Sequence, residues 1–235
     1  LYFTQVFRCA RKTGLVHADT KLTFLGFGTM NGKNGKPFKT REGGVMRLSA
    51  LLADINEEMY QKISENQTMN EEEARETARV VALSAVKYGD LSNQASKDYI
   101  FDIERFTSFE GNTGPYLLYT IVRIKSILKK YEQTGKSALG KKILPPDSES
   151  EKALMLEVSR FHGMIASAFD ELAPHKVCAY LYDLANAFNH FYHETKILAQ
   201  EDDQRQAGYI LLLQLCKGIM ETCIDVLGFS APERM

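Results

Sequence analysis

Residues 174–193 have the sequence PHKVCAYLYDLANAFNHFYH, the pattern of a long helix with one buried face. Apolar side chains return in steps of three and four, as they do along one side of an α-helix. These positions are Val177, Leu181, Leu184, Phe188 and Phe191. Pro174 suits the first turn, because a backbone N–H has no helical partner there in any case. The stretch therefore predicts one long helix that packs against others.

The segments on either side repeat this pattern. The preceding segment is predicted to be a helix with an apolar face at Leu154, Val158, Phe161, Ile165 and Leu172. The following segment has its apolar face at Ile210, Leu213, Cys216, Ile219, Cys223 and Val226, and it is expected to end at Gly228. Three long helices with this spacing predict a helical bundle.

The chain is also helical in character upstream of the bundle. Residues 46–63, 69–88 and 115–133 are predicted helices. Asn70 is an expected cap of the second, since three glutamates follow it where the helix dipole favours anions. Pro115 is expected in the first turn of the third. Residues 134–150 are a predicted loop, and residues 99–110 show no clear preference.

The first 47 residues differ from the rest. Residues 1–12 are a predicted helix that ends near Gly14, and the apolar stretch 22–30, LTFLGFGTM, is expected to be a strand or a buried turn. Residues 31–45 contain four glycines, one proline and several lysines, and are predicted to form a cationic loop. The fold class is therefore mainly α, with a short α/β segment before the helical domain.

The composition is that of a soluble globular protein, with 44% hydrophobic and 25% charged residues in a chain of 235. It excludes disordered and collagen-like classes. The longest aliphatic run, Ile210–Leu213, is far short of the roughly 20 residues that span a bilayer, so no membrane partner is expected. No cysteine lies in a CxxC pair, which favours a reduced, cytoplasmic compartment, with Cys216 and Cys223 as buried hydrophobes.

The net charge of −1 conceals alternating segments. Residues 1–47 hold nine basic and two acidic side chains, and residues 123–142 hold seven and one. The segments 48–122 and 143–235 each have an excess of seven acidic side chains. Two basic segments suit a polyanionic partner, whereas intermixed charges would cancel in the folded protein. The charge pattern alone leaves both possibilities open.

The sharpest local feature is the loop KPFKTREGG, residues 36–44. Lysine is a mobile point charge and glycine lets the backbone approach closely, so two lysines three apart in such a loop can hold phosphates. The loop lacks the GxxxxGK[ST] pattern of a P-loop. By spacing alone, a solvated basic loop is the commoner outcome.

A second candidate site lies at the start of the helix 115–133. Tyr116 and Tyr119 are three residues apart there, after Asn112 and before Arg123. Aromatic rings stack on unpaired bases, and neighbouring cations hold phosphates. Half-buried core tyrosines have the same spacing, so the residues alone leave RNA contact open.

No metal site or activated nucleophile is predicted. The run His190-Phe-Tyr-His193-Glu194 differs from the zincin HExxH, and no third ligand group is indicated elsewhere. No GxSxG occurs, and no cysteine has a convincing basic partner.

Three stretches together resemble the C-terminal part of the arginyl-tRNA synthetases, a family of class I aminoacyl-tRNA synthetases. The first, FGTM (27–30) with residues 35–44, is similar to the divergent KMSKS loop of this family. The second comprises YGDLSN (88–93), KDYIFD (97–102) and SFEGNTGPYLLY (108–119). The third runs from PHKVCAYLYDLA (174–185) to FNHFY (188–192) and ends with APERM (231–235). Together they cover nearly the whole chain.

The resemblance implies roles for particular residues. Lys36, Lys39 and Thr40 take the place of KMSKS as catalytic residues, and Lys39 would stabilise the ATP phosphates as pyrophosphate leaves. The implied ATP-phosphate loop comprises Gly35, Lys36, Lys39, Gly43 and Gly44. The implied tRNA contacts are Asn112, Tyr116, Tyr119, Arg123 and Met235.

The resemblance also implies an organisation and a reaction. Residues 1–47 would end a Rossmann-like catalytic domain, 48–70 would form a connecting helix, and 71–235 the helical anticodon-binding domain. The full-length enzyme would use ATP and Mg²⁺ to join L-arginine to tRNA(Arg). The HIGH motif and the amino-acid pocket would lie upstream. This chain alone is therefore expected to be inactive, to carry no bound cofactor, and to be a cytoplasmic monomer.

Two alternatives remain open. The chain could be a helical protein-interaction module with no nucleic-acid role, in which case neither the basic loop nor the tyrosine helix would bind RNA. It could also be a fragment of another class I synthetase. Arginine-dependent charging by the full-length parent, lost on Lys39→Ala, distinguishes that last case.

Overall fold

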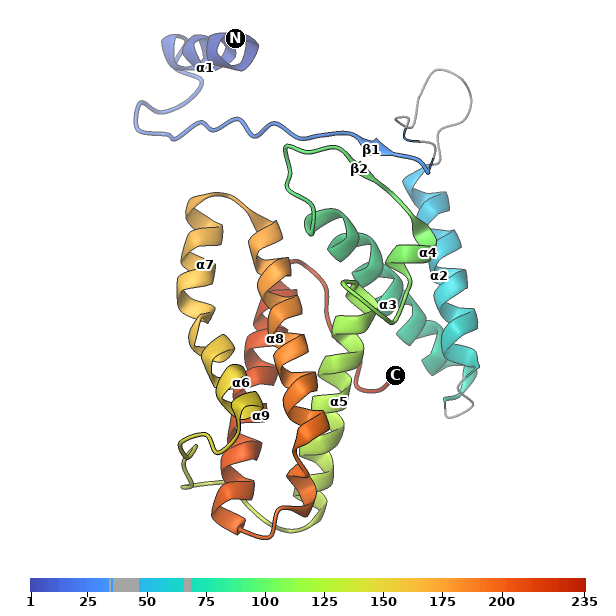
Figure 1. Cartoon of the computed structure of the whole chain (residues 1–235). Coiled ribbons are helices and arrows are strands. Elements are labelled where there is room, and N and C mark those ends of the chain that lie inside the picture. Colours follow the sequence, from blue (N-terminus) through green and yellow to red (C-terminus); the bar gives the residue numbers. More distant parts are fainter. Residues whose placement is uncertain (34, 36–46, 66–68) are drawn as a thin grey trace.

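The structure is a computed structural model that describes residues 1–33, 35, 47–65 and 69–235 (Figure 1). The described part is mainly helical, as expected, with one sheet of two short strands. A helical bundle forms one side of the fold, a helical hairpin lies beside it, and an extended segment leads to the N-terminus (Figure 1).

The N-terminal segment begins with helix α1 (Tyr2–Lys12), which lies apart from the body of the fold. Strand β1 (Met30–Asn31) follows after an extended stretch and pairs in parallel with β2 (Tyr99–Ile100). The expectation of a strand or buried turn over 22–30 is wrong for most of that stretch, where Phe24, Leu25 and Phe27 are exposed. Phe24 stacks on Phe3 of α1, with ring centroids 4.2 Å apart, but within the described residues no strand pairs with this stretch before Met30, so its β-propensity is not satisfied by a sheet.

The hairpin consists of α2 (Leu48–Ser64) and α3 (Glu71–Leu91). Leu51, Ile55, Met59 and Ile63 repeat every four residues along α2, and all four are buried. Asn70 caps α3 as expected, because its side-chain oxygen accepts the backbone N–H of Glu73 at 2.9 Å. After β2, the ambiguous stretch continues as the short helix α4 (Ile103–Phe106) and a loop.

The bundle contains α5 (Gly114–Gln133), α6 (Glu149–Ser159), α7 (Phe161–Asp170), α8 (Pro174–Glu194), the 3₁₀ turn η1 (Ile197–Ala199) and α9 (Asp203–Val226). The single helix expected over 154–172 is wrong, because α6 and α7 are separate and Leu172 lies beyond them. At Arg160 the ψ angle is −13°, and the backbone N–H is shared between two carbonyls. This ψ departs from the helical value of about −42°, so the chain turns there.

Helix α9 is a core helix of the bundle. Among the described helices it alone is long and apolar enough to cross a membrane, yet 61% of its apolar window is buried inside the fold. Cys216 and Cys223 lie on its buried face, as expected. Burial raises the pKa of both thiols to about 12, so they remain protonated and unreactive.

Candidate nucleic-acid interface

The first turn of α5 is held in one position by its own sequence. The Thr113 hydroxyl accepts the backbone N–H of Tyr116 at 3.2 Å and donates to the carbonyl of Ser108 at 2.6 Å. Gly114 passes so close to α3 that a Cβ atom there would lie 2.4 Å from the carbonyl oxygen of Ser84. This close approach requires glycine and fixes the direction in which α5 leaves the turn.

A buried tyrosine ties the same turn to α8. Tyr88 of α3 is fully buried, and its hydroxyl lies 2.5 Å from Oδ1 of Asn112 and 2.8 Å from the carbonyl oxygen of Cys178. Asn112 is exposed, and its amide oxygen accepts this bond from Tyr88. Helices α3 and α8 and the loop before α5 therefore meet at one hydroxyl behind the candidate site.

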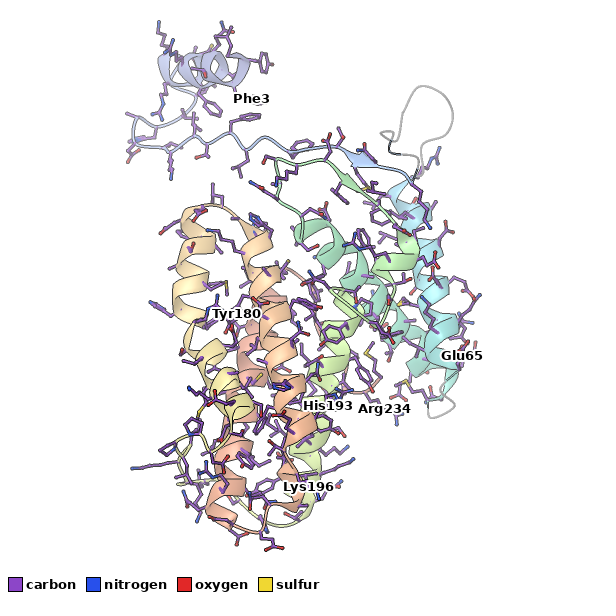
Figure 2. The ribbon with its side chains drawn as sticks, in the orientation of Figure 1. Phe3, Glu65, Tyr180, His193, Lys196 and Arg234 are labelled. Carbon is purple, nitrogen blue, oxygen red and sulfur yellow. The ribbon has the colours of Figure 1, made fainter. Side chains whose placement is uncertain are left out.

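Four of the five expected RNA contacts meet in one cavity of about 510 Å³. Its lining comes from the end of α2, the loop before α5, α5, α8 and the C-terminal residue. The lining residues are Lys62, Ile63, Phe109, Glu110, Tyr116, Tyr119, Arg123, Asn189, His193 and Met235. Asn112 is not among them. Figure 2 labels His193 on α8 and Arg234 on the C-terminal tail. In that view these two residues lie on either side of α5.

Arg123 is the central cation of this cavity. Its guanidinium lies 4.8 Å from the ring centroid of Tyr119 and 5.2 Å from that of Tyr192. It also donates to Oδ1 of Asn189 at 2.5 Å. Two aromatic rings and one amide contact the group, as in cation–π binding of a guanidinium.

Asn189 connects Arg123 to the second tyrosine. Its amide nitrogen donates to the Tyr116 hydroxyl at 2.9 Å, and that hydroxyl donates to Asn186 at 2.8 Å. Burial raises the pKa of the Tyr116 phenol, against a smaller lowering by the bond from Asn189, so the phenol is neutral at physiological pH. Tyr119 is 42% exposed and leaves part of its ring open to a ligand.

None of the five contacts expected from the sequence lies on α8. Asn189 and His193 line the cavity and Tyr192 stacks on Arg123. The neighbouring Phe191 is fully buried, whereas Tyr192 is 37% exposed. The available signal was the position of Tyr192 one residue beyond the apolar face, which turns its ring away from the core.

Most of the candidate ATP-phosphate loop lies outside the described residues. The residues concerned are Lys36, Lys39, Thr40, Gly43 and Gly44. Gly35 is described, has a φ of +71° and closes a turn by donating to the carbonyl of Gly32 at 2.8 Å. Lys33 lies 3.1 Å from Asp102, which raises the pKa of its ammonium group and fastens the start of the loop to the segment after β2.

The histidines of α8 do not converge on one point. His190 lies 3.7 Å from Glu194, whereas His193 lines the cavity. Within the described ranges, no group of three or more potential ligands could hold a metal ion.

Two family models match the chain. Residues 117–235 match the DALR anticodon binding domain, and residues 1–103 match the catalytic domain of class I tRNA synthetases (R). Together with the bundle and its aromatic cavity, these matches define a helical anticodon-binding domain joined to part of a class I synthetase catalytic domain.

The chain belongs to the DALR anticodon-binding domain family, and it is similar over its whole length to arginine–tRNA ligases. It is 63% identical to the arginine–tRNA ligase of Agathobacter rectalis, and it covers 41% of that protein. It is 53% identical to the arginine–tRNA ligase of Alkaliphilus oremlandii and covers 40% of it. The chain therefore spans about 40% of the length of these curated relatives. The resemblance predicted from the three sequence stretches is confirmed.

Solved structures agree with this assignment. Arginyl-tRNA synthetase from Thermus thermophilus superposes with a TM-score of 0.79 at 28% identity, over 90% of this chain and 35% of that one. The arginyl-tRNA synthetase from Plasmodium falciparum has a TM-score of 0.80 at 24% identity, over all of this chain and 39% of that one, and supports the fold alone.

Proposed function

We propose that this chain is the anticodon-binding part of an arginine–tRNA ligase and that its cavity receives an unpaired base of the tRNA anticodon loop. The full-length enzyme would convert ATP, L-arginine and tRNA(Arg) to arginyl-tRNA(Arg), AMP and diphosphate. The division into residues 1–47, 48–70 and 71–235 assigns the last of these to RNA binding.

The observation that carries this proposal is the stacked arrangement of Tyr119, Arg123 and Tyr192 beside an amide network. An unpaired base offers a π-face to Tyr119 and hydrogen-bonding edges to Asn189 and the neutral Tyr116 hydroxyl. Arg123 supplies positive charge for the flanking phosphate. A wholly apolar groove for a partner helix would need none of these polar groups.

The second part of the proposal concerns the loop before α2. We assign Lys36, Lys39 and Thr40 to the ATP-phosphate site, with Gly35, Gly43 and Gly44 allowing close approach of the backbone. ATP and Mg²⁺ would act in the full-length enzyme, where the lysines balance charge on the phosphates as pyrophosphate leaves. L-Arginine would bind upstream residues, and the enzyme would work as a cytoplasmic monomer.

RNA titration of the chain tests the first part. The chain would be titrated at moderate salt with an arginine tRNA transcript and with the same transcript carrying a substituted anticodon. Removal of one stacked base contact by Tyr119→Ala is expected to weaken binding by about 5- to 150-fold, from about 1–3 kcal/mol per base. Asn112→Ala would test the fifth expected contact in the same assay.

Tyr60→Ala is a matched control. Tyr60 also stacks with an arginine, Arg75 at 4.3 Å, but neither residue lines the cavity. Its loss should leave RNA affinity unchanged. Equal binding of both transcripts by the wild-type chain, or no binding, would contradict anticodon recognition and favour a protein-interaction module.

The full-length enzyme tests the second part. Lys39→Ala is expected to reduce arginine-dependent ATP–pyrophosphate exchange by at least about 100-fold, the scale of a lost transition-state charge contact. RNA affinity is expected to be unchanged, because we assign Lys39 to the ATP phosphates and not to the RNA cavity. Undiminished exchange would remove Lys39 from the reaction.

A further inference from the structure

The C-terminal tail ends at the candidate RNA cavity. After α9 the chain runs back across the hairpin and α5, and Figure 1 places the C-terminus beside α5. Met235 lines the cavity together with Tyr116 and Tyr119. It also lines a second cavity of about 770 Å³, whose other lining residues include Lys125 and Lys129. The Met235 side chain therefore borders empty space on more than one side.

Met235 packs partly against the hydrophobic core, but this packing leaves its side chain more than one position. Methionine is unbranched and has three rotatable side-chain bonds, so it adapts to irregular space. Contacts made by the residues before Met235 are therefore expected to help hold it in position.

Polar contacts tie the tail at three points. Lys87 of α3 donates to the carbonyl of Gly228. Lys125 of α5 donates to the carbonyl of Pro232 at 3.3 Å and to the carboxylate of Glu233 at 2.7 Å. Arg234 then binds Glu73 through two parallel bonds, from Nε to Oε1 and from Nη2 to Oε2.

The Arg234–Glu73 pair is the tie closest to Met235 and the most directional of the three. A two-bond contact between a guanidinium and a carboxylate fixes orientation as well as distance. Glu73 sits in the first turn of α3, where its backbone N–H is held by the cap Asn70. α3 packs along α2, and the end of α2 contributes Lys62 and Ile63 to the same cavity.

We propose that Glu73 and Arg234 are positioning residues for the cavity, holding Met235 at its margin so that the cavity admits the cognate base and discriminates against others. This inference rests on the proposed function. The pair touches no RNA in this assignment. It acts through Met235, and its loss widens the cavity toward the second one.

A structural role is separable from this positioning role. The two side chains are 33% and 55% exposed, and exposed ion pairs contribute little to global stability. Glu73→Gln and Arg234→Gln are therefore expected to leave the thermal midpoint of the chain nearly unchanged. Their effect should appear at Met235 and in base discrimination.

The first measurement is the methyl resonance of ¹³C-labelled Met235 in the free chain. Ring currents from the cavity tyrosines should displace it from its random-coil position. Either single variant is expected to move it toward that position, and the double variant no further than either single one, because both remove the same pair. Glu76→Gln is the matched control. It breaks another two-bond pair on α3, between Glu76 and Arg79, and should leave the resonance in place.

The second measurement is the ratio of affinities for an arginine tRNA transcript and for one with a substituted anticodon. Glu73→Gln is expected to reduce this ratio at least three-fold, while Glu76→Gln preserves it. An unmoved methyl resonance would overturn the positioning role whether or not RNA binds. A moved resonance with an unchanged ratio would overturn its link to discrimination. A wild-type chain that binds no RNA would contradict the proposed function, and the resonance would still decide the positioning role.

Discussion

Gly114→Ala should displace the start of α5 and impair the RNA cavity with it. The added Cβ would lie 2.4 Å from the carbonyl oxygen of Ser84 and 2.6 Å from its carbon, against ordinary contacts of 3.4–4 Å. One helix must therefore move by about 1 Å, and the opposing atoms are backbone atoms that cannot rotate away. Overpacking of this kind costs about 1–3 kcal/mol, and alanine returns at most about 1 kcal/mol of helix propensity.

The expected net destabilisation is about 1 kcal/mol, equivalent to a fall of roughly 2–4 °C in thermal midpoint for a chain of this size. Circular dichroism melting would measure it, and the RNA titration would show weaker binding, because Tyr116 and Tyr119 project from the displaced turn. Gly218→Ala is the matched control: no atom lies within 4 Å of the new methyl group in α9, so the midpoint should rise slightly. An unchanged or raised midpoint for Gly114→Ala would refute the steric reasoning.

Three further changes have defined outcomes. Arg123→Lys keeps the charge but loses the planar contact with two tyrosine rings, so RNA affinity should fall about ten-fold in the same titration, and equal affinity would argue against stacking. Tyr88→Phe removes a hydroxyl that lies between the buried carbonyl of Cys178 and the amide oxygen of Asn112, which should cost about 1–3 kcal/mol in urea unfolding; a change below about 0.5 kcal/mol would contradict this. For Glu58, burial raises the pKa, but hydrogen bonds from Lys62 and Thr107 outweigh it and leave the pKa below 4.5. Relative to Glu58→Gln, the ionised Glu58 carboxylate should therefore stabilise the folded chain fully at pH 7, and this advantage should shrink as the pH falls below about 4.5. If urea unfolding showed the same difference in free energy of unfolding between the two proteins from pH 7 down to pH 3, this prediction would be wrong.

The bundle could be predicted because a helix with one buried face has apolar residues at regular spacing in its sequence. Leu181 and Phe188 are fully buried, as their spacing indicates. The break between α6 and α7 at Arg160 has no such sequence signal, since neither proline nor glycine occupies that position. Contacts of both α6 and α7 with α8 accompany the turn there, and these are tertiary contacts that no window of sequence contains.

The candidate site was predictable only along one helix. Steps of three and four place Tyr116, Tyr119 and Arg123 on one face of α5, and this follows from the sequence. Periodicity says which face of α8 is buried but not which helix its other faces meet. Asn189 lies 66 residues beyond Arg123, so their hydrogen bond could not be inferred.

The charge pattern shows the same limit. The basic segment 123–142 suggests a positive patch, but Lys136 lies 2.6 Å from Asp203 and Lys125 lies 2.7 Å from Glu233. Both acidic partners are distant in sequence, so part of the positive charge is cancelled by the fold. Arg123 stays at the cavity, held by amide and aromatic groups. Recognition here depends on one oriented guanidinium more than on the net charge of the segment.

Helix α2 follows one candidate site in sequence and ends at the other. It begins at Leu48, one residue after Arg47 and just beyond the loop assigned to the ATP phosphates, and its end supplies Lys62 and Ile63 to the RNA cavity. Its 17 residues span about 25 Å, and an apolar row along its length is buried in the core that it shares with α3. A base that displaces Ile63 would therefore act on a helix whose first residue follows the loop closely in sequence, since a helix with one face buried along its length moves as a unit and not residue by residue.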